Sequence, residues 1–342
     1  MNFAPWARCA ALAVGLGTGL PLPAMSQSDF YAGKTITLFA GFPPGGGVDG
    51  EMRMVAQHLQ RFIPGAPSIV AKNMPGAGGI ALANTLYNNV APDGLTIGMP
   101  GRSGFLLSKI VNTAGVRFDP SKFIYIGAAG STNSILWLRR ELGIESLEQL
   151  PGPRELVLGA WSSRSQNAIV PKVLAKYRGW PLKVVHGYRG TAETLLALER
   201  GEIDGLYSHE GTIQAGRPDL FEGGKIIPIF QSFDELPKVP VITESATGPR
   251  ETSLLKLLNS PSQVGLALVA PPGVSNDRVS ILRRAYTRMT DDKEYRFEAE
   301  KRGIALGQPM TGEELQRLVE QTFAEASAEV VSEYMSYTEE VK

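Results

Sequence analysis

Apolar and polar side chains alternate with a period of two along residues 34–40, and this alternation predicts a β-strand. From about Asp49 onward, apolar side chains recur at helical spacing, at Met52, Val55 and Leu59, which predicts an amphipathic helix. Strand-like and helix-like segments then follow one another along most of the chain. Their alternation predicts an α/β protein with mainly parallel sheets.

The periodic segments define the expected elements. We expect strands at residues 34–40, 68–72, 95–99, 123–127, 155–159, 182–186, 203–207, 225–231 and 264–269, and helices at about 49–62, 80–89, 166–177, 192–200, 275–289, 293–301 and 311–337. Because no low-complexity linker interrupts this series, we expect ordered strands to carry the chain between two lobes. The expected first lobe contains residues 27–128 and 232–342, and the second contains residues 129–231.

The most informative local feature is the glycine run Gly45–Gly47, which joins the first expected strand to the first expected helix. A glycine-rich turn at the start of a helix exposes backbone N–H groups and the positive end of the helix dipole. This arrangement binds phosphate or carboxylate. The turn therefore predicts a small acidic ligand held mainly by the backbone, although a glycine-rich turn without a ligand agrees equally well with the local sequence.

The N-terminus has the features of an export signal. Arg8 supplies the positive charge, residues 10–20 form a short apolar stretch, and Ala24-Met25-Ser26 offers a cleavage site. We expect residues 1–26 to be a signal peptide and the mature protein to be periplasmic; an uncleaved membrane anchor is the less favoured alternative. The only cysteine, Cys9, lies within the expected signal, which excludes disulfides and thiolate chemistry from the mature chain.

The composition and the missing motifs exclude several functions. Lys and Arg number 34, as do Asp and Glu, and this balance gives no basis for binding nucleic acid. The chain lacks a Gly-x-Ser-x-Gly nucleophile elbow, a complete phosphate-binding loop and a His-Glu-x-x-His motif. Residues 76–81 match a Gly-x-Gly-x-x-Ala pattern, but no acidic residue closes a second strand at the required distance. We expect no cofactor, no metal ion and no catalysis.

Several short motifs occur in order between about Tyr31 and the C-terminus. They are GFPPGGGVD at 41–49, NMPGAGG at 73–79, APDGLT at 91–96, GYRGTA at 187–192, GEID at 201–204, LPKVP at 236–240 and APPGV at 270–274. Their sequences and their order closely resemble those of the solute receptors of tripartite tricarboxylate transporters, also called TctC-like or Bug receptors. Several ordered motifs are far more specific than any one of them.

This resemblance implies a type II periplasmic binding fold, with two α/β lobes around a ligand cleft. It implies a small carboxylate ligand, held by the first strand–helix loop and by a second-lobe loop, largely through backbone amides and bridging waters. It also implies delivery of this ligand by a monomeric receptor to the membrane permease subunits of a tripartite tricarboxylate-type transporter. The expected ligand-binding residues are Phe42, Pro44, Gly45, Gly46, Gly47, Val48, Asp49, Arg102, Ser163, Tyr188, Arg189, Gly190, Thr191 and Ala192.

The chain departs from the family pattern at places that would shape ligand identity. Val48 stands where many relatives have Thr or Ser, Arg189 replaces the commoner Lys, and residues 101–104 and 160–165 differ from the family's usual loops. The resemblance therefore does not name the ligand.

For several side chains the sequence leaves two possible roles open. Asp49 is expected to cap the first helix, with ligand contact as the alternative. Trp161 is either an aromatic residue in the cleft or part of the core. Arg102, Arg164 and Arg189 are each expected to be surface or interlobe charges, and whether one of them reaches the ligand's distal group is left open.

Three functions remain open at this stage. A transport receptor is favoured. The alternative is a sensory module of the same fold that presents a bound carboxylate to a sensor kinase. An exported enzyme that uses the anion site for acid–base chemistry is the third class, and no set of residues supports it.

Overall fold

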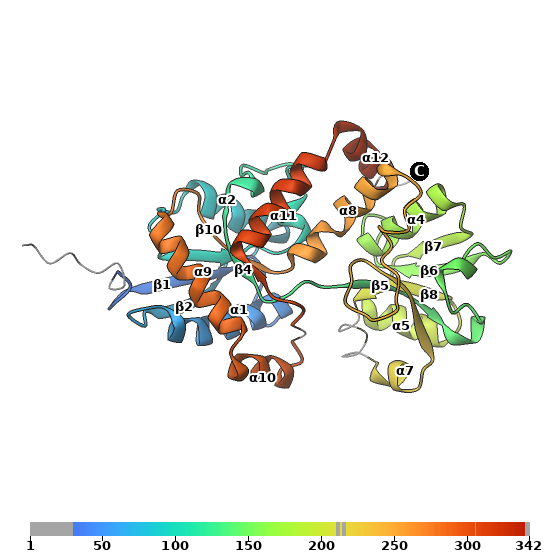
Figure 1. Ribbon diagram of the computed structural model, residues 1–342, viewed down its shortest axis with the longest axis horizontal. Coiled ribbons are helices and arrows are strands. Elements are labelled where there is room, and N and C mark those ends of the chain that lie inside the picture. The colour runs from blue at the N-terminus through green and yellow to red at the C-terminus, as the bar shows by residue number, and fades with distance from the viewer. Residues whose placement is uncertain (1–29, 210–212, 214–216, 305, 339–342) are drawn as a thin grey trace, which may run out of the picture.

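The chain forms two separate β-sheets, each covered by helices. The computed structural model describes residues 30–209, 213, 217–304 and 306–338, so the expected signal peptide lies outside the described residues. One sheet has six strands in the order β11-β4-β10-β3-β1-β2, and the other has five in the order β7-β6-β8-β5-β9. We call each sheet with its helices a lobe; the first lobe lies at the left of Figure 1 and the second at the right.

The first lobe combines the N-terminal and C-terminal parts of the chain. Its strands are β1 (Thr35–Ala40), β2 (Ser68–Asn73), β3 (Thr96–Met99), β4 (Ile124–Ala128), β10 (Ala267–Ala270) and β11 (Met310–Thr311). Its main helices are α1 (Gly47–Leu59), α2 (Ile80–Asn88), α9 (Asn276–Thr290), α10 (Lys293–Lys301) and α11 (Gly312–Glu325), with the short α3 (Ser103–Leu106). Helices α1, α9 and α10 share one apolar core with β1, which fixes α1 against the sheet.

The second lobe is built from the middle of the chain. Its strands are β5 (Ser134–Arg139), β6 (Leu156–Ala160), β7 (Leu182–His186), β8 (Gly205–His209) and β9 (Ile226–Gln231), and its helices are α4 (Gln166–Arg178), α5 (Thr191–Glu199) and α7 (Pro218–Glu222). Short 3-10 turns lie at η2 (Gln60–Phe62), η3 (Ala77–Gly79), η4 (Pro120–Lys122), η5 (Arg140–Leu142) and η6 (Leu147–Gln149). Strand β6 lies between β7 and β8 and runs parallel to both, so the carboxyl ends of these three strands lie at one edge of the sheet.

The α/β class is confirmed, and the expectation of mainly parallel sheets is correct for only part of the strands. Strand β1 pairs in parallel with β2 and β3, whereas β10 runs antiparallel to β3 and β4, and β5 runs antiparallel to β8 and β9. Strand β4 lies in the first sheet and β5 in the second, so the parallel pattern is interrupted where the chain crosses between the lobes. The strand expected to return at 225–231 is β9, which pairs with β5 in the second sheet.

The structure also differs from other expectations of the sequence analysis. Strand β5 and helix α8 (Pro249–Val264) were not predicted, and Val264 ends α8 instead of beginning a strand. The single helix expected at 311–337 is divided into α11 and α12 (Ala328–Thr338). The break occurs because Ala326 has a non-helical ψ of 70°, and the Ser327 hydroxyl then accepts a hydrogen bond from the Val330 amide at 3.3 Å.

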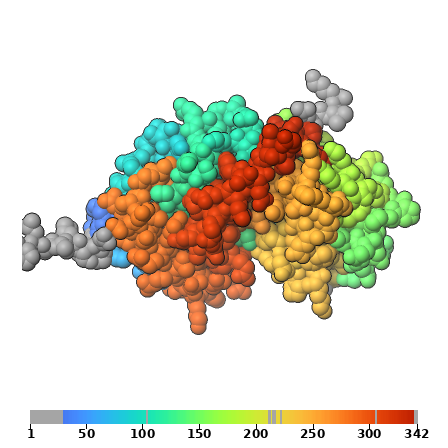
Figure 2. Space-filling model, turned by 45° about the horizontal axis from the view of Figure 1, so that its top comes forward, coloured from blue at the N-terminus to red at the C-terminus, as the bar shows by residue number. Residues whose placement is uncertain are grey.

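Helices α8 and α12 connect the two lobes. They lie between the lobes at the top of Figure 1, and Figure 2 shows the red C-terminal helices running across the surface towards the green second lobe. Arg178 of α4 donates to Glu251 of α8 at 2.6 Å, and both side chains are buried. The buried Glu333 of α12 accepts hydrogen bonds from Lys176 of α4 at 3.0 Å and from Arg250 of α8 at 2.5 Å. These ion pairs attach α8 and α12 to the second lobe.

Replacing Glu333 by glutamine tests this attachment. Burial opposes ionisation of Glu333, but hydrogen bonds from Arg250 and Lys176 outweigh it and hold the pKa at about 2. The stabilisation is therefore present above the ordinary pKa near 4.5 and is lost as the pH falls towards 2. We expect Glu333→Gln to lower the free energy of unfolding at pH 7 by about 1–3 kcal/mol, measured by urea titration.

A matched control is available in the neighbouring helix. Glu325 of α11 pairs with Lys256 of α8 at 3.2 Å, but both side chains are exposed to solvent. Glu325→Gln should change stability by no more than about 0.5 kcal/mol. Equal effects of the two substitutions would contradict a specific role of Glu333.

Candidate functional site

The first expected ligand loop lies where β1 ends and α1 begins. Gly46 is the N-cap of α1 and has extended backbone geometry, and the Gly50 amide donates back to the Gly46 carbonyl at 2.9 Å. The first amides of a helix have no acceptor within the helix, so the N–H groups around Gly47 and Val48 are free to bind an anion. Residues Pro44 to Gly47 are exposed, and Phe42 and Val48 are partly buried.

The glycines of this loop are not required by packing. An added Cβ at Gly46 or Gly47 would meet no atom within 4 Å, and the φ of Gly46 is an ordinary −89°. In contrast, a Cβ at Gly79 would lie 1.6 Å from the Pro100 carbonyl oxygen, so that glycine is required by the protein itself. The open space over Gly46 and Gly47 leaves the backbone accessible to a ligand at close range.

The buried side chain of Asp49 fixes the first loop through hydrogen bonds. Its side chain is buried and accepts hydrogen bonds from the Gly45 amide at 2.9 Å, from Arg53 at 3.0 Å and from Asn73 at 2.8 Å. The Arg53 hydrogen bond, aided by those of Gly45 and Asn73, lowers the pKa of Asp49 to about 2. The expectation that Asp49 caps the helix is wrong, because α1 begins at Gly47 and Asp49 reaches back from inside its first turn. Ligand contact by Asp49 remains a prediction.

The second expected loop repeats this arrangement in the other lobe. Gly190 is the N-cap of α5 in an extended conformation, and a Cβ there would also meet no atom within 4 Å. Glu193 lies in the first turn of α5, and its carboxylate accepts a hydrogen bond from the Arg189 amide at 2.7 Å. The Glu193 carboxylate thus fixes the backbone amide of Arg189 in the same way as the Asp49 carboxylate fixes that of Gly45. Thr191 and Ala192 supply the first amides of α5.

The remaining expected residues of the second lobe surround this loop. The Gly187 amide donates to the Trp161 carbonyl at 3.3 Å, which joins the loops that follow β6 and β7. Trp161 is 40% exposed, so its interpretation as a core residue is wrong. Ser163 is buried in the same turn as Trp161, and Tyr188 packs partly against the α5 core.

The three candidate arginines have different surroundings. Arg164 donates to the Thr338 carbonyl of α12 at 3.0 Å, and the Arg189 side chain is exposed. Arg102, which follows β3 at the same sheet edge as the first loop, has a buried Nε without a hydrogen-bond partner among the described residues. Its charge also helps to lower the pKa of His209, at the end of β8, to about 4, where burial is the larger cause. The charge of Arg102 in the first lobe therefore acts on a residue of the second lobe.

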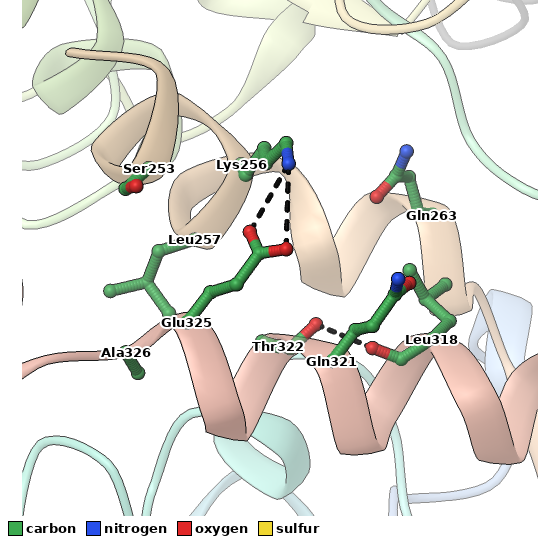
Figure 3. A pocket seen from close by; sticks show the side chains of 9 residues that line it. All are labelled: Ser253, Lys256, Leu257, Gln263, Leu318, Gln321, Thr322, Glu325 and Ala326. Carbon is green, nitrogen blue, oxygen red and sulfur yellow. Dashed lines mark hydrogen bonds and ion pairs between the residues drawn. The ribbon is translucent and has the colours of Figure 1, made fainter. Parts of the chain in front are cut away.

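A cavity between two helices does not coincide with the expected loops. It has a volume of about 210 Å³, lies between α8 and α11, and is lined by Lys256, Leu257, Leu318 and Glu325 among others (Figure 3). The Lys256–Glu325 ion pair spans it. None of the expected ligand-binding residues lines this cavity, which separates it from the paired glycine loops.

The described part of the chain contains neither a candidate metal site nor a candidate membrane span. Among residues 30–209, 213, 217–304 and 306–338, no group of three His, Cys, Asp or Glu side chains is arranged to hold a metal ion. Within the same ranges, no helix combines the length and apolar composition needed to cross a bilayer.

Solved structures of solute-binding proteins share this fold. A TctC solute-binding protein from Polaromonas, solved without ligand, superposes with a TM-score of 0.69 at 17% identity, covering 90% of this chain and 98% of that one. MatC from Rhodopseudomonas palustris with bound malate superposes with a TM-score of 0.54 at 22% identity, covering 90% of this chain and 99% of that one. R. palustris Rpa4515 with adipate superposes with a TM-score of 0.56 at 21% identity, covering 89% of this chain and 97% of that one.

The sequence comparisons identify the family. The model of the tripartite tricarboxylate transporter family receptor, TctC, matches residues 52–332, and the chain belongs to this family. The UPF0065 protein in the gbd 5′ region of Cupriavidus necator is 26% identical over 307 residues, which is 86% of each chain. The family resemblance of the sequence motifs is thereby confirmed. The matched range includes Arg102 and Tyr188–Ala192 but begins after the Gly45–Asp49 loop.

The Asp49–Arg53 pair gives a direct test of how the first loop is held. Because the pKa of Asp49 is lowered from 3.8 to about 2, its stabilisation is present above pH 4 and lost as the pH falls through 2. We expect Asp49→Asn to lower the free energy of unfolding by about 1–2 kcal/mol at pH 7 and by much less at pH 2.

A double-mutant cycle supplies the control. The double variant Asp49→Asn/Arg53→Met should lose less free energy of unfolding than the sum of the losses in the two single variants, because both substitutions remove the same pair. Strict additivity in urea titrations would show that the contact contributes nothing.

Proposed function

We propose that this protein is a periplasmic receptor that captures a small carboxylate between its lobes and delivers it to the membrane subunits of a tripartite tricarboxylate-type transporter. One observation carries the proposal: each lobe presents a glycine-capped helix N-terminus, at Gly46 and at Gly190, with open space over the glycine. An anion shared by both loops would bind the closed arrangement of the lobes better than the open one, and this difference in affinity would drive closure.

The chemistry of the two loops supports a carboxylate ligand. A helix N-terminus stabilises an anion by about 0.3–1 kcal/mol, and hydrogen bonds from backbone amides to a charged group add about 1.5–3 kcal/mol each. Structural relatives were solved with malate and with adipate, which are both carboxylates. The receptor class of the family supports binding and delivery over catalysis.

The same proposal covers export and the division of the chain. We propose cleavage after Ser26 and a monomeric mature protein in the periplasm. Sheet membership supports lobe boundaries near 128 and 231, because β4 ends at Ala128 and β9 ends at Gln231.

Substitutions of the N-cap glycines test the proposed site. We expect Gly46→Val, and likewise Gly190→Val, to weaken binding of the tightest carboxylate by at least about tenfold, because the new side chain occupies the space over the amides. Binding is measured by isothermal titration calorimetry after a thermal-shift screen of mono-, di- and tricarboxylates. The fold should persist, since no atom lies within 4 Å of the added Cβ.

Gly248 provides the matched control. It is the extended N-cap glycine of α8, and a Cβ there also meets no atom within 4 Å. Gly248→Val should bind the same carboxylate with wild-type affinity. Wild-type affinity in Gly46→Val would sink the assignment of the first loop.

Reversing the charge of Arg189 tests closure. The exposed Arg189 adjoins the α5 N-cap, so Arg189→Glu should repel the anion and leave the lobes open at ligand concentrations that close the wild-type protein. Small-angle X-ray scattering with and without the carboxylate reports this difference. Arg189→Lys should retain closure if the role is electrostatic, and should lose affinity if Arg189 makes a bidentate contact. Normal closure of Arg189→Glu would place the second half of the site elsewhere.

A further inference from the structure

Helix α8 lies between the two sheets, and its polar contacts show which lobe holds it more firmly. The Gln166 side chain of α4 donates to the Leu258 carbonyl of α8 at 2.9 Å and accepts from the Ser262 hydroxyl of α8 at 3.1 Å. The buried Tyr207 hydroxyl of β8 donates to the side chain of Asn259, also on α8, at 3.2 Å. Two elements of the second lobe are thus hydrogen-bonded to the last turns of α8.

Helix α12 has the same preference. The Arg164 side chain, between β6 and α4, donates to the Thr338 carbonyl at the end of α12 at 3.0 Å. The buried Glu333 of α12 accepts from the Tyr177 hydroxyl of α4 at 2.9 Å, in addition to the ion pairs described above. In the part of the chain that the structure describes, no hydrogen bond or ion pair joins α12 to a helix or strand of the first lobe. The contacts of α12 therefore attach it to the second lobe.

The first lobe holds α8 differently. Helices α8 and α11 share an apolar core, and among the described residues their one polar contact is the exposed Lys256–Glu325 ion pair at 3.2 Å. Apolar contacts are non-directional, so packed helices can slide over one another. Breaking the buried Arg178–Glu251 pair between α4 and α8 would instead leave buried charges without partners. Motion between the lobes should therefore occur between α8 and α11.

The chain can turn where it passes between these two groups of elements, and the first passage follows β4. Ala128 is the last residue of β4 and pairs with β10, and the Thr132 amide already donates to the Ser262 carbonyl of α8 at 2.9 Å. Between them, the backbone of Gly130 and Ser131 makes no hydrogen bond to any described residue. These two residues form the first hinge position.

The second passage is at Gly265, between α8 and β10. Its φ of 62° and ψ of −146° are accessible almost only to glycine. A Cβ at Gly265 would lie 2.2 Å from the Gly130 carbonyl oxygen, and a Cβ at Gly130 would lie 2.2 Å from the Gly307 amide nitrogen. The first two passages thus touch backbone to backbone, which places both hinge positions together.

The third passage separates α11 from α12. Ala326, with a φ of −77° and a ψ of 70°, ends α11, and Ser327 precedes α12. The three passages enclose residues 132–264 and 327–338, of which the structure describes all but 210–212 and 214–216. We call this set the second body, and the other described residues the first body. The second body contains the second lobe together with α8 and α12.

We infer that the lobes close by rotation of the whole second body, including α8 and α12, against the first body, and that α8 slides along α11 during this rotation. This inference rests on the proposed function, which requires closure on a ligand. The cavity between α8 and α11 takes Lys256 and Gln263 from the second body and Gln321 and Glu325 from the first, so its shape changes with closure (Figure 3). The division expected from the sequence, with residues 232–342 in the first lobe, would leave this cavity unchanged.

Distances between pairs of spin labels distinguish the two divisions. The only cysteine of the chain is Cys9, so labels are introduced in a Cys9→Ser background. Lys256→Cys on α8 is combined with Lys301→Cys on α10 in one variant and with Lys183→Cys on β7 in another; all three side chains are exposed. A third variant, Lys183→Cys/Lys301→Cys, reports closure itself.

The distances are measured by double electron–electron resonance, with and without succinate, malate, adipate or citrate. An acid that changes the distance between positions 183 and 301 should also change that between 256 and 301, by more than about 2 Å. The distance between 256 and 183 should stay constant, because both labels belong to the second body. The exposed Ser332 of α12, substituted by cysteine in place of Lys256, should give the same pattern.

A cross-link between α8 and α11 gives a second test. Lys256→Cys/Glu325→Cys, joined by a short bismaleimide, should lose the ligand-dependent change in the radius of gyration measured by small-angle X-ray scattering. Lys183→Cys/Glu155→Cys is the matched control, because these exposed side chains also form an ion pair, at 3.8 Å, but within the second lobe. Its cross-linked form should close as the wild-type protein does.

The outcomes separate this inference from the proposed function. If none of the four acids changes the distance between 183 and 301, closure and this inference both fail. If that distance changes while the distance between 256 and 301 stays constant, closure stands and the place of α8 in the second body is overturned. Normal closure of the cross-linked Lys256→Cys/Glu325→Cys protein would overturn the sliding of α8 along α11.

Discussion

In each lobe, the expected ligand loop is fixed by a carboxylate in the first turn of the helix that follows it, and the proposed site depends on this hydrogen bond. Asp49 does this for Gly45 in the first lobe, and Glu193 does it for Arg189 in the second. In each case the N-cap between them is a glycine with open space above it. The acidic side chain fixes the loop from its own helix, so the amides of the N-cap region remain free for another anion.

The environment of the two carboxylates differs. Asp49 is buried and also accepts from Arg53 and Asn73, which ties the first loop to β2. Glu193 is exposed, so its hydrogen bond ties the second loop less firmly to the rest of the second lobe. A rigid first loop and a more adaptable second loop suit a receptor that binds an anion on one lobe before the other lobe reaches it.

Much of this arrangement could be predicted from the sequence because it is local. The glycine runs and the start of a helical period mark both loops, and β7 and α10 lie where their patterns placed them. Strand β5 was missed because its side chains are buried on both faces, which removes the period of two. Helix α8 was missed because Asn259, Ser260 and Ser262 are buried between the lobes, which removes its polar face.

The surroundings of Arg102 could not be predicted from the sequence for a different reason. Arg102 follows β3 in the first lobe, and its charge acts on His209 at the end of β8 in the second lobe. These two residues are far apart in the sequence, so no local pattern connects them.

The central claim is that one carboxylate is held by both helix N-termini. The most direct measurement is a titration of ¹⁵N-labelled protein with the tightest carboxylate, followed through the backbone amide resonances of Gly46, Gly47 and Val48 and of Gly190, Thr191 and Ala192. The account predicts that both sets shift with one shared dissociation constant, while the amide of Gly248 does not move. A response confined to one loop, or two different dissociation constants, would contradict it.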